Sequence, residues 1–137
     1  MKIKSNKTFS ITKSNHIIIE CNINSVAAKL IIDTGASNSC LDSSSRKKFN
    51  LKCEKSIDEA SSANSRIDEI FYSKNNTLEI NNIKKNDFEI VVFDMTHINN
   101  SLKEKGIDKV DGIIGGDILI EFNADINYKK KILNLEF

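Results

Sequence analysis

Apolar and polar side chains alternate along much of this chain, which is the pattern of half-buried β-strands. Every second residue of the segment Ile17–Ile23 is apolar, and the alternation resumes over Val26–Ile32 after an Asn-Ser pair typical of a tight turn. These two segments are predicted to form a hairpin. Its second strand runs directly into Asp33, so a buried strand would deliver a carboxylate to a defined place.

Two further hairpins are indicated by the same pattern. Strands are expected on both sides of the Asn81-Asn82 turn, over residues 78–80 and 88–93. The chain ends in a last pair of strands over residues 124–128 and 131–137. Strands therefore dominate, and the expected fold class is all-β.

Helices are predicted only as short pieces. One follows a helix start at Asp42 and covers residues 46–49, and a polar stretch over 96–105 is interpreted as helical. Another, amphipathic helix is expected over residues 118–122, capped by the side chain of Asp117.

Length and charge restrict the classes of protein to consider. The 137 residues are enough for one domain with its own hydrophobic core, so residues 1–137 are treated as a single domain. With 20 basic and 19 acidic residues, the formal net charge of +1 gives no reason to expect a nucleic-acid or membrane partner. The basic run Lys129–Lys131 is interpreted as a solvated turn.

The three cysteines argue against a disulfide framework and against a zinc site. The three cysteines, Cys21, Cys40 and Cys53, are too few to pair completely, and no two of them form a Cys-x-x-Cys motif. The chain has only two histidines that could complete a zinc site with them. They are interpreted as small core residues in a reducing compartment, and no cofactor or metal is expected. A nucleophile at Cys40 partnered by His97 is the alternative, but nothing around Cys40 resembles an activating environment.

The cellular location of the protein is inferred from the N-terminal segment and from the lengths of the apolar runs. The basic opening of the chain is not followed by the apolar run of a signal peptide. No stretch approaches the roughly 20 apolar residues that cross a bilayer. A cytoplasmic protein is therefore expected.

The Asp33-Thr34-Gly35 run carries the chemistry that the pattern suggests. A carboxylate at the end of a buried strand, followed by a glycine that permits a sharp turn, suits acid-base activation of water by a pair of aspartates. Because the chain has one such run, the second aspartate would come from a second copy. The alternative is an aspartate that only caps a turn.

Three other aspartates have structural interpretations. Asp111 is the nearest rival as a second carboxylate, but its place beside a glycine favours a turn residue. Asp117 is interpreted as a helix cap, and Asp125 as a surface position on a strand.

Two runs of the chain resemble the retropepsin-like aspartic proteases, single-lobe relatives of pepsin that work as homodimers. Ile31–Ser37 (Ile-Ile-Asp-Thr-Gly-Ala-Ser) is similar to their catalytic loop, and Ile113–Gly115 to their apolar-apolar-glycine loop. The start of the following helix and the final hairpin are also similar, so the resemblance covers residues 16–137. It implies a closed acid-protease β-barrel lobe with one to three short helices, assembled as a homodimer.

The resemblance also implies a role for each residue of the first loop. Asp33 of each protomer would supply one carboxyl of a dyad that shares a proton and holds the attacking water. Thr34 would hydrogen-bond across the dimer axis, Gly35 would point its N–H at the dyad, and Ser37 would hydrogen-bond the charged carboxylate. The supporting residues would be Ala36, Ile113, Ile114 and Gly115.

The stretch over residues 54–72 is interpreted as an exposed hairpin over a cleft or as a plain surface loop. Members of the resembled family close a glycine-tipped hairpin, the flap, over the substrate. No glycine lies between Gly35 and Gly106, so a flap here would turn on small polar residues. The candidate substrate-binding residues are Ala60, Ser61, Ser62 and Ala63.

The ends of the chain are candidates for the dimer interface. Apolar residues alternate over residues 131–137 as in an edge strand that would invite pairing with a partner. Residues 1–15 have fewer apolar side chains and are the weaker candidate for the same interface.

The leading functional hypothesis is an aspartic endopeptidase that hydrolyses an extended polypeptide with water activated between two Asp33 carboxyls. The glycine-free flap motivates an alternative, a catalytically silent peptide-binding or dimerisation module on the same fold. A third interpretation is an unrelated small β-barrel in which Asp33 only caps a turn.

Overall fold

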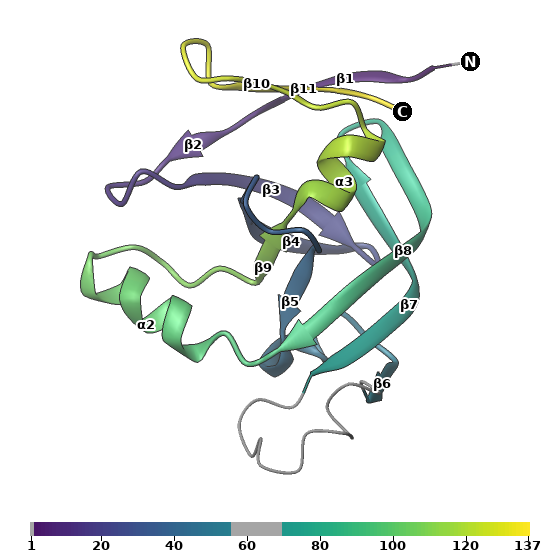
Figure 1. The fold of residues 1–137 in the computed structure, drawn as a ribbon, viewed down its shortest axis with the longest axis vertical. Helices are drawn as coiled ribbons and strands as arrows, with labels where there is room; N and C mark the ends of the chain where they lie inside the picture. Colours follow the sequence, from purple (N-terminus) through teal and green to yellow (C-terminus); the bar gives the residue numbers. More distant parts are fainter. Residues whose placement is uncertain (1, 56–69) are drawn as a thin grey trace.

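The computed structural model describes residues 2–55 and 70–137, in which strands predominate (Figure 1). The helical segments are the 3-10 helix η1 (Ser43–Ser45), α2 (Thr96–Glu104) and α3 (Gly116–Glu121). The strands are β1 (Lys4–Thr8), β2 (Ser10–Ile11), β3 (Ile17–Ile23), β4 (Val26–Ile32), β5 (Cys40–Asp42), β6 (Cys53–Lys55), β7 (Phe71–Ile80), β8 (Ile83–Phe93), β9 (Gly112–Ile114), β10 (Asp125–Asn127) and β11 (Ile132–Glu136).

The larger sheet closes into a barrel. Its strands follow the order β2-β3-β4-β9-β5-β8-β7-β6, and an additional pairing between β3 and β7 closes the six strands from β3 to β7 of this series into a ring. The barrel interior is filled by aliphatic and aromatic side chains such as Ile23, Leu78 and Phe88, each at most 2% exposed. The expected all-β, closed-barrel fold class is confirmed.

The predicted hairpins are present. β3 and β4 pair antiparallel from Ile17 opposite Ile32 to Ile23 opposite Val26, and the Asn-Ser turn between them has positive φ at both residues. β7 pairs with β8 around the Asn81-Asn82 turn, and β10 pairs with β11 at the end of the chain. β7 and β8 are longer than predicted, because polar residues on their outer face continue the ladder.

The parallel strands β4 and β9, in the middle of the larger sheet, position the loop of residues 33–37, called here the Asp33 loop. Ile31 of β4 lies opposite Ile113 of β9, and Ile32 lies opposite Ile114. β9 also pairs antiparallel with β5, where its Gly112 packs so closely that an added Cβ would lie 2.1 Å from the carbonyl oxygen of Cys40. Only glycine fits at that crossing.

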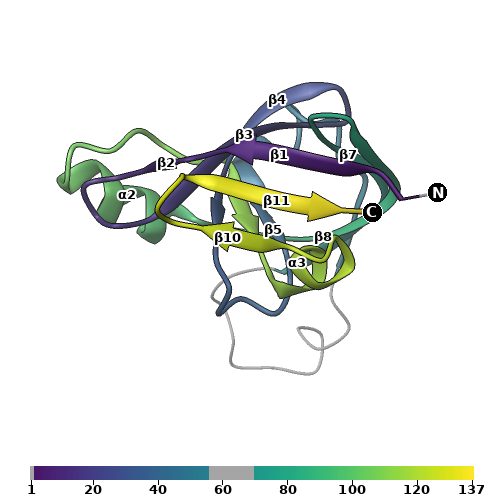
Figure 2. The ribbon, with the colours of Figure 1, turned by 90° about the horizontal axis from the view of Figure 1, so that it is seen from above.

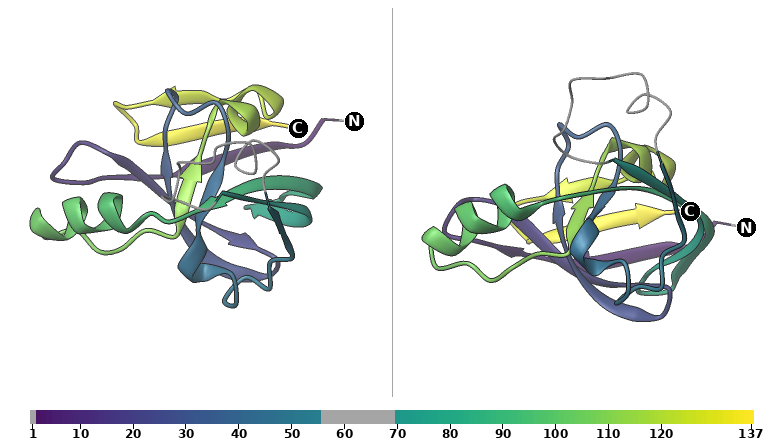
Figure 3. Two further views of the ribbon diagram at one scale, coloured as in Figure 1. Left: turned by 60° about the horizontal axis from the view of Figure 1, so that its bottom comes forward. Right: turned by 90° about the horizontal axis from the view of Figure 1, so that it is seen from below.

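A second, smaller hydrophobic cluster lies between the barrel and α2. Ile31 and Ile113 pack there with Met95 and Leu102, and the last two are at most 3% exposed. α2 lies at the opposite side of the barrel from the β7–β8 hairpin, as two further views show (Figure 3). The helix expected over residues 96–105 is therefore confirmed, and its apolar face covers one side of the central strands.

The two ends of the chain form a separate three-stranded sheet. β11 is its central strand, with β1 on one side and β10 on the other, both antiparallel (Figure 2). Residues 131–137 are therefore not a lone edge strand within the chain, and their part in a dimer interface stays a prediction. The alternating apolar residues Leu133 and Leu135 of β11 point into the core, which is why the pattern looked like a half-buried strand.

Side chains of the Asn81-Asn82 turn cover the outer edge of β1. The amide of Asn81 donates to the carbonyl of Asn6 (3.0 Å), and that of Asn82 donates to the carbonyl of Lys4 (3.1 Å). These bonds satisfy carbonyl groups that would otherwise be free on an edge strand. β1 is thus held between β11 and the β7–β8 turn of its own chain.

One predicted helix is absent. Residues 46–49 form turns after the single 3-10 turn of η1, and Asp42 caps that turn by accepting a hydrogen bond from the N–H of Ser44. The turns end at Asn50, whose left-handed conformation, φ 53°, directs the chain toward β6 before a regular helix can form.

Candidate active site

Asp33 lies at the end of β4, in a loop that is open to solvent. Its backbone N–H donates to the carbonyl of Ile114 (2.9 Å), which continues the β4–β9 ladder by one residue. Its carboxylate accepts the N–H of Gly35 (2.9 Å), and the N–H of Ala36 donates to its carbonyl (3.1 Å). Thr34 and Gly35 are exposed, while Asp33 is half-buried. A carboxyl group is therefore held in place with one side available to a ligand.

The residues after β9, Gly115 to Asp117, form a glycine loop that supports the Asp33 loop from beneath. The N–H of Gly116 donates to the carbonyl of Ala36 (2.7 Å), and the N–H of Asp117 donates to the carbonyl of Ser37 (3.2 Å). A Cβ at Gly115 would lie 2.6 Å from the Ala36 carbonyl oxygen, well inside van der Waals contact. The two runs that the sequence singled out thus meet in space, with glycine required at the contact.

Asp117 has a different role from the predicted one. Gly115 is the N-cap of α3 and makes no side-chain cap hydrogen bond, so the prediction that Asp117 caps this helix is wrong. The Asp117 carboxylate instead accepts the N–H (3.0 Å) and the hydroxyl (2.7 Å) of buried Ser39, whose oxygen accepts the N–H of Gly115 (2.9 Å). This network ties the chain after the Asp33 loop to the glycine loop.

Sequence reasoning missed Ser39. Ser39 directly precedes β5, and the residue is only 1% exposed. Its hydroxyl is therefore a polar group at a core position. A buried serine at the start of an apolar strand is a signal for a satisfied polar network, but the chain gives no sign that the acceptor is Asp117, 78 residues away.

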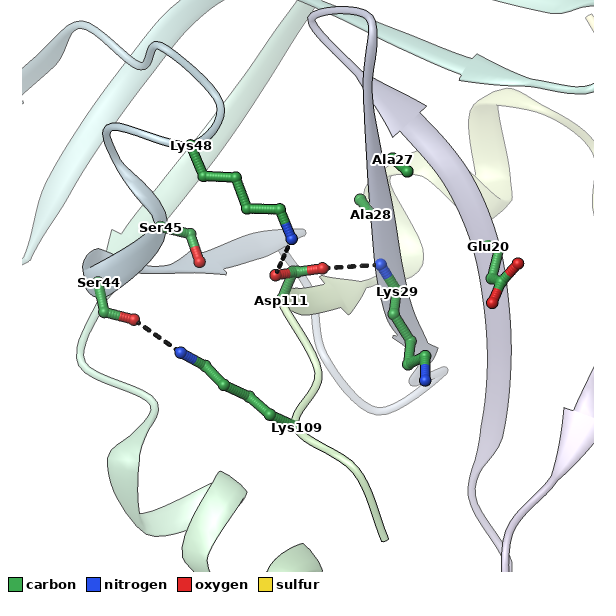
Figure 4. A pocket seen from close by; sticks show the side chains of 9 residues that line it. All are labelled: Glu20, Ala27, Ala28, Lys29, Ser44, Ser45, Lys48, Lys109 and Asp111. Carbon is green, nitrogen blue, oxygen red and sulfur yellow. Dashed lines mark hydrogen bonds and ion pairs between the residues drawn. The ribbon is translucent and has the colours of Figure 1, made fainter.

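Asp111 is placed away from Asp33. It precedes β9 beside Lys29 of β4, so four residues of extended chain, about 13 Å, separate it from Asp33. Its carboxylate accepts the N–H of Lys29 (2.9 Å) and the ammonium of Lys48 (3.0 Å), at the centre of a pocket that also contains Lys109 (Figure 4). At that separation Asp111 does not share a proton with Asp33.

Comparison with protein families then identifies the chain. A model of the family described as Aspartyl protease matches residues 19–118, which include both loops. The chain belongs to the aspartyl protease family. This membership excludes the interpretation as an unrelated small β-barrel.

Three solved structures share the fold. A retropepsin-like aspartic protease from Rickettsia conorii superposes with a TM-score of 0.65 at 17% identity, covering 100% of this chain and 93% of that one. The retroviral protease-like domain of Ddi1 from Leishmania major gives 0.63 at 19% identity, covering 88% and 87%. The EIAV protease complexed with the inhibitor HBY-793 gives 0.56 at 16% identity, covering 86% and 98%. A search of curated proteins found no match.

Some site residues of this aspartyl protease family member stay predictions. Among the described residues, Gly35 is the one hydrogen-bond donor to the Asp33 carboxylate, so the bond expected from Ser37 is not seen in the single chain. The candidate substrate-binding residues Ala60, Ser61, Ser62 and Ala63 lie outside the described residues. β6 and β7 pair antiparallel on either side of them, from Cys53 opposite Ser73 to Lys55 opposite Phe71.

Neither a metal centre nor a membrane span is found in the described part of the chain. It contains no group of three histidine, cysteine, aspartate or glutamate side chains that could hold a metal ion. None of its helices is long and apolar enough to cross a membrane.

The cysteines were interpreted as small core residues, and the structure buries two of them fully and one partly. Cys21 and Cys40 are buried and Cys53 is half-buried, all as free thiols. Burial raises the pKa of the Cys21 and Cys40 thiols from 9.0 to about 12 and also raises the pKa of Cys53. Such thiols are poor nucleophiles near neutral pH, because the reactive form is the thiolate.

We expect the two buried cysteines to resist a thiol reagent in the native protein. At pH 8, labelling of Cys21 and Cys40 by DTNB should be slower than in urea by about 10³-fold, the change in thiolate fraction for three pH units. Because their native pKa values are raised, native stability should also fall as the pH rises from about 9 toward about 12. Fast native labelling of Cys40 would restore the nucleophile hypothesis.

Proposed function

We propose that two copies of this chain form an aspartic endopeptidase that hydrolyses peptide bonds of extended polypeptides. The observation that carries the proposal is the Asp33 carboxyl, held by the Gly35 N–H on an exposed loop within an aspartyl protease fold. Asp111 and Asp117 are engaged with Lys48 and Ser39, so neither supplies the second carboxyl within the chain. A second copy supplies it instead.

The reaction follows from two carboxyls facing each other. Two close like charges resist joint ionisation, so the pair shares one proton and binds a water molecule between them. The ionised carboxylate takes a proton from the water as its oxygen attacks the peptide carbonyl carbon. The protonated carboxyl gives its proton to the carbonyl oxygen. The tetrahedral species then breaks its C–N bond as the carboxyl that took the water proton gives it to the amine leaving group. The other carboxylate takes a proton from a hydroxyl of the tetrahedral species, which restores the shared proton.

The remaining loop residues have supporting roles in this proposal. Thr34 is exposed, as a side chain that contacts its counterpart across the dimer axis must be. Gly35 keeps its N–H on the carboxylate, and Ser37 approaches the ionised Asp33 once the pair has formed. Ala36 and the run Ile113–Gly115 hold the loop from below, and Ala60–Ala63 contact the substrate backbone as an added strand.

Digestion of unfolded casein tests the proposal. The wild-type chain, incubated from about pH 3 to about pH 7, should produce new peptides at acidic to near-neutral pH, where the pair holds one proton. A statine-containing peptide, whose hydroxyl takes the place of the attacking water, should stop cleavage and raise the melting temperature. A chain that neither cuts casein nor responds to the statine peptide is the catalytically silent module instead.

A further inference from the structure

A cavity of about 320 Å³ lies between α2 and the strand that leads to Asp33. Its volume is at the lower end of the range for ligand pockets, enough for one amino-acid side chain. Its apolar lining comes from Ile31 of β4 and from Ile98 and Leu102 of α2, which pack in the cluster beneath the helix. The cavity therefore has an aliphatic floor built by two rigid elements.

The position of Ile31 places this cavity beside the candidate active site. Residues two apart on a strand point to the same face, and the Asp33 N–H continues the ladder of β4. Ile31 and Asp33 are thus on one face, with Cα atoms about 7 Å apart. An extended substrate whose scissile bond lies at Asp33 can direct a neighbouring side chain onto Ile31.

The rim of the cavity is basic. It is formed by His16, before β3, and by His97 and Lys105 at the two ends of α2. These are both histidines of the chain, brought together from positions 81 residues apart. No carboxylate lines this cavity among the described residues. The pocket around Asp111 differs, because two carboxylates, Glu20 and Asp111, line it together with its lysines (Figure 4).

The basic groups of the rim are available to a ligand. The Ser14 hydroxyl hydrogen-bonds Nδ1 of His16 (2.6 Å), which orients the ring and leaves Nε2 without a partner among the described residues. Over the same residues, the side chains of His97 and Lys105 have no hydrogen bond or ion pair. Asp94, the acidic group that interacts electrostatically with His97, is itself held by the N–H and hydroxyl of Thr96.

We propose that this cavity binds the side chain of an acidic substrate residue, glutamate, next to the scissile bond, an inference that rests on the proposed protease function. The two methylene groups of glutamate lie on Ile31, Ile98 and Leu102. Its carboxylate reaches His16, His97 and Lys105, where charge-assisted hydrogen bonds favour it over an uncharged group. The cavity makes the enzyme selective for polypeptides that carry glutamate at this position.

Matched peptides test this selectivity. The fastest casein cleavage site is copied into peptides with Glu, Gln or Leu at each position flanking the cut. At about pH 5.5, within the acidic to near-neutral range expected for the pair of carboxyls, the wild type should cleave one Glu peptide about tenfold faster in kcat/KM than its Gln counterpart. In the variant His97→Gln/Lys105→Gln this ratio should fall to about one. Equal cleavage of Glu and Gln peptides by the wild type overturns the proposal.

Lys103→Gln is the matched control. Lys103 is exposed on α2, carries the same charge and lies outside the cavity lining. The Glu preference should survive this change. If Lys103→Gln lost the Glu preference to the same extent as the double variant, the preference would come from the general charge of the helix. That result would overturn the proposed site.

A binding measurement separates this inference from the proposed catalysis. The Asp33→Asn variant, which binds without cutting, is titrated with N-acetylglutamate N-methylamide and with its glutamine analogue. The glutamate probe should shift the NMR signals of both imidazole rings and the glutamine probe should not. Equal shifts, or none, overturn the subsite even if casein is cleaved. Shifts without casein cleavage overturn the protease proposal but keep the acidic-side-chain site.

Discussion

Asp33→Asn is expected to abolish casein hydrolysis while leaving the fold intact. The change removes both carboxyls of the proposed dyad at once, because each protomer carries it. The rate should fall by at least about 10³-fold, since an amide can neither take the proton of the attacking water nor share one. The rate of appearance of casein peptides measures the loss.

The fold should survive because asparagine keeps the local hydrogen bond. Its side-chain oxygen can accept the Gly35 N–H as Asp33 does, and the backbone bond to Ile114 is unchanged. The free energy of unfolding should therefore change by less than about 1 kcal/mol. Asp108→Asn, at a carboxylate with a 92% exposed side chain, is the matched control and should keep full activity. An Asp33→Asn protein with more than about a tenth of the wild-type rate would contradict the proposal.

Mixing the two proteins tests whether the carboxyls come from different chains. When wild type is equilibrated with an equal amount of Asp33→Asn, half of the wild-type chains pair with an inactive partner. Activity should then fall to about half of that of the same wild-type protein alone. A site completed within one chain would keep full activity in the mixture.

Gly115→Ala is expected to produce the largest loss of stability among the site residues. An added Cβ would lie 2.6 Å from the carbonyl oxygen of Ala36 and 2.9 Å from the backbone of Asn38, so the loop or β9 must move. Overpacking of this kind should lower the free energy of unfolding by about 3 kcal/mol. The urea midpoint at constant m-value measures it. Activity should fall as well, because the atom that is displaced belongs to the Asp33 loop.

Gly116→Ala is the matched neighbour. The nearest atom to its added Cβ is the same Ala36 oxygen at 3.5 Å, an ordinary contact, and the residue begins α3. Alanine should be neutral there or stabilise the helix by up to about 1 kcal/mol. Equal stability of the two variants would show that the loop accommodates a methyl group at Gly115.

Local patterns predicted the hairpins and the loop well. β3 and β4 are neighbours in sequence, and the Asn-Ser turn between them offers the left-handed angles that such a turn needs. The run Ile113–Gly115 was singled out by its resemblance to the apolar-apolar-glycine loop of the retropepsin-like proteases. In each case the residues that determine the structure lie within a few positions of one another.

Contacts between distant segments could not be predicted from such patterns. The alternation over residues 131–137 is the same for an edge strand and for a central strand with one buried face, so the pattern could not show that β1 pairs with the second edge of β11. Asp117 directly precedes an amphipathic run, which is the position of a helix cap, and its actual partner Ser39 is remote in sequence. The meeting of His16 and His97 at one cavity likewise depends on how α2 packs on β4.

The closure of β1, β11 and β10 within one chain has a consequence for regulation. Because the described strands β1, β11 and β10 pair with one another, we expect each protomer to complete this sheet and bury its core without a strand from its partner. Pairing of the proposed protease would then need no exchange of terminal strands between the two copies. Below the dissociation constant, hydrolysis would rise with the square of the protein concentration. The cell could hold this chain as a folded, silent reserve and switch it on by accumulating it.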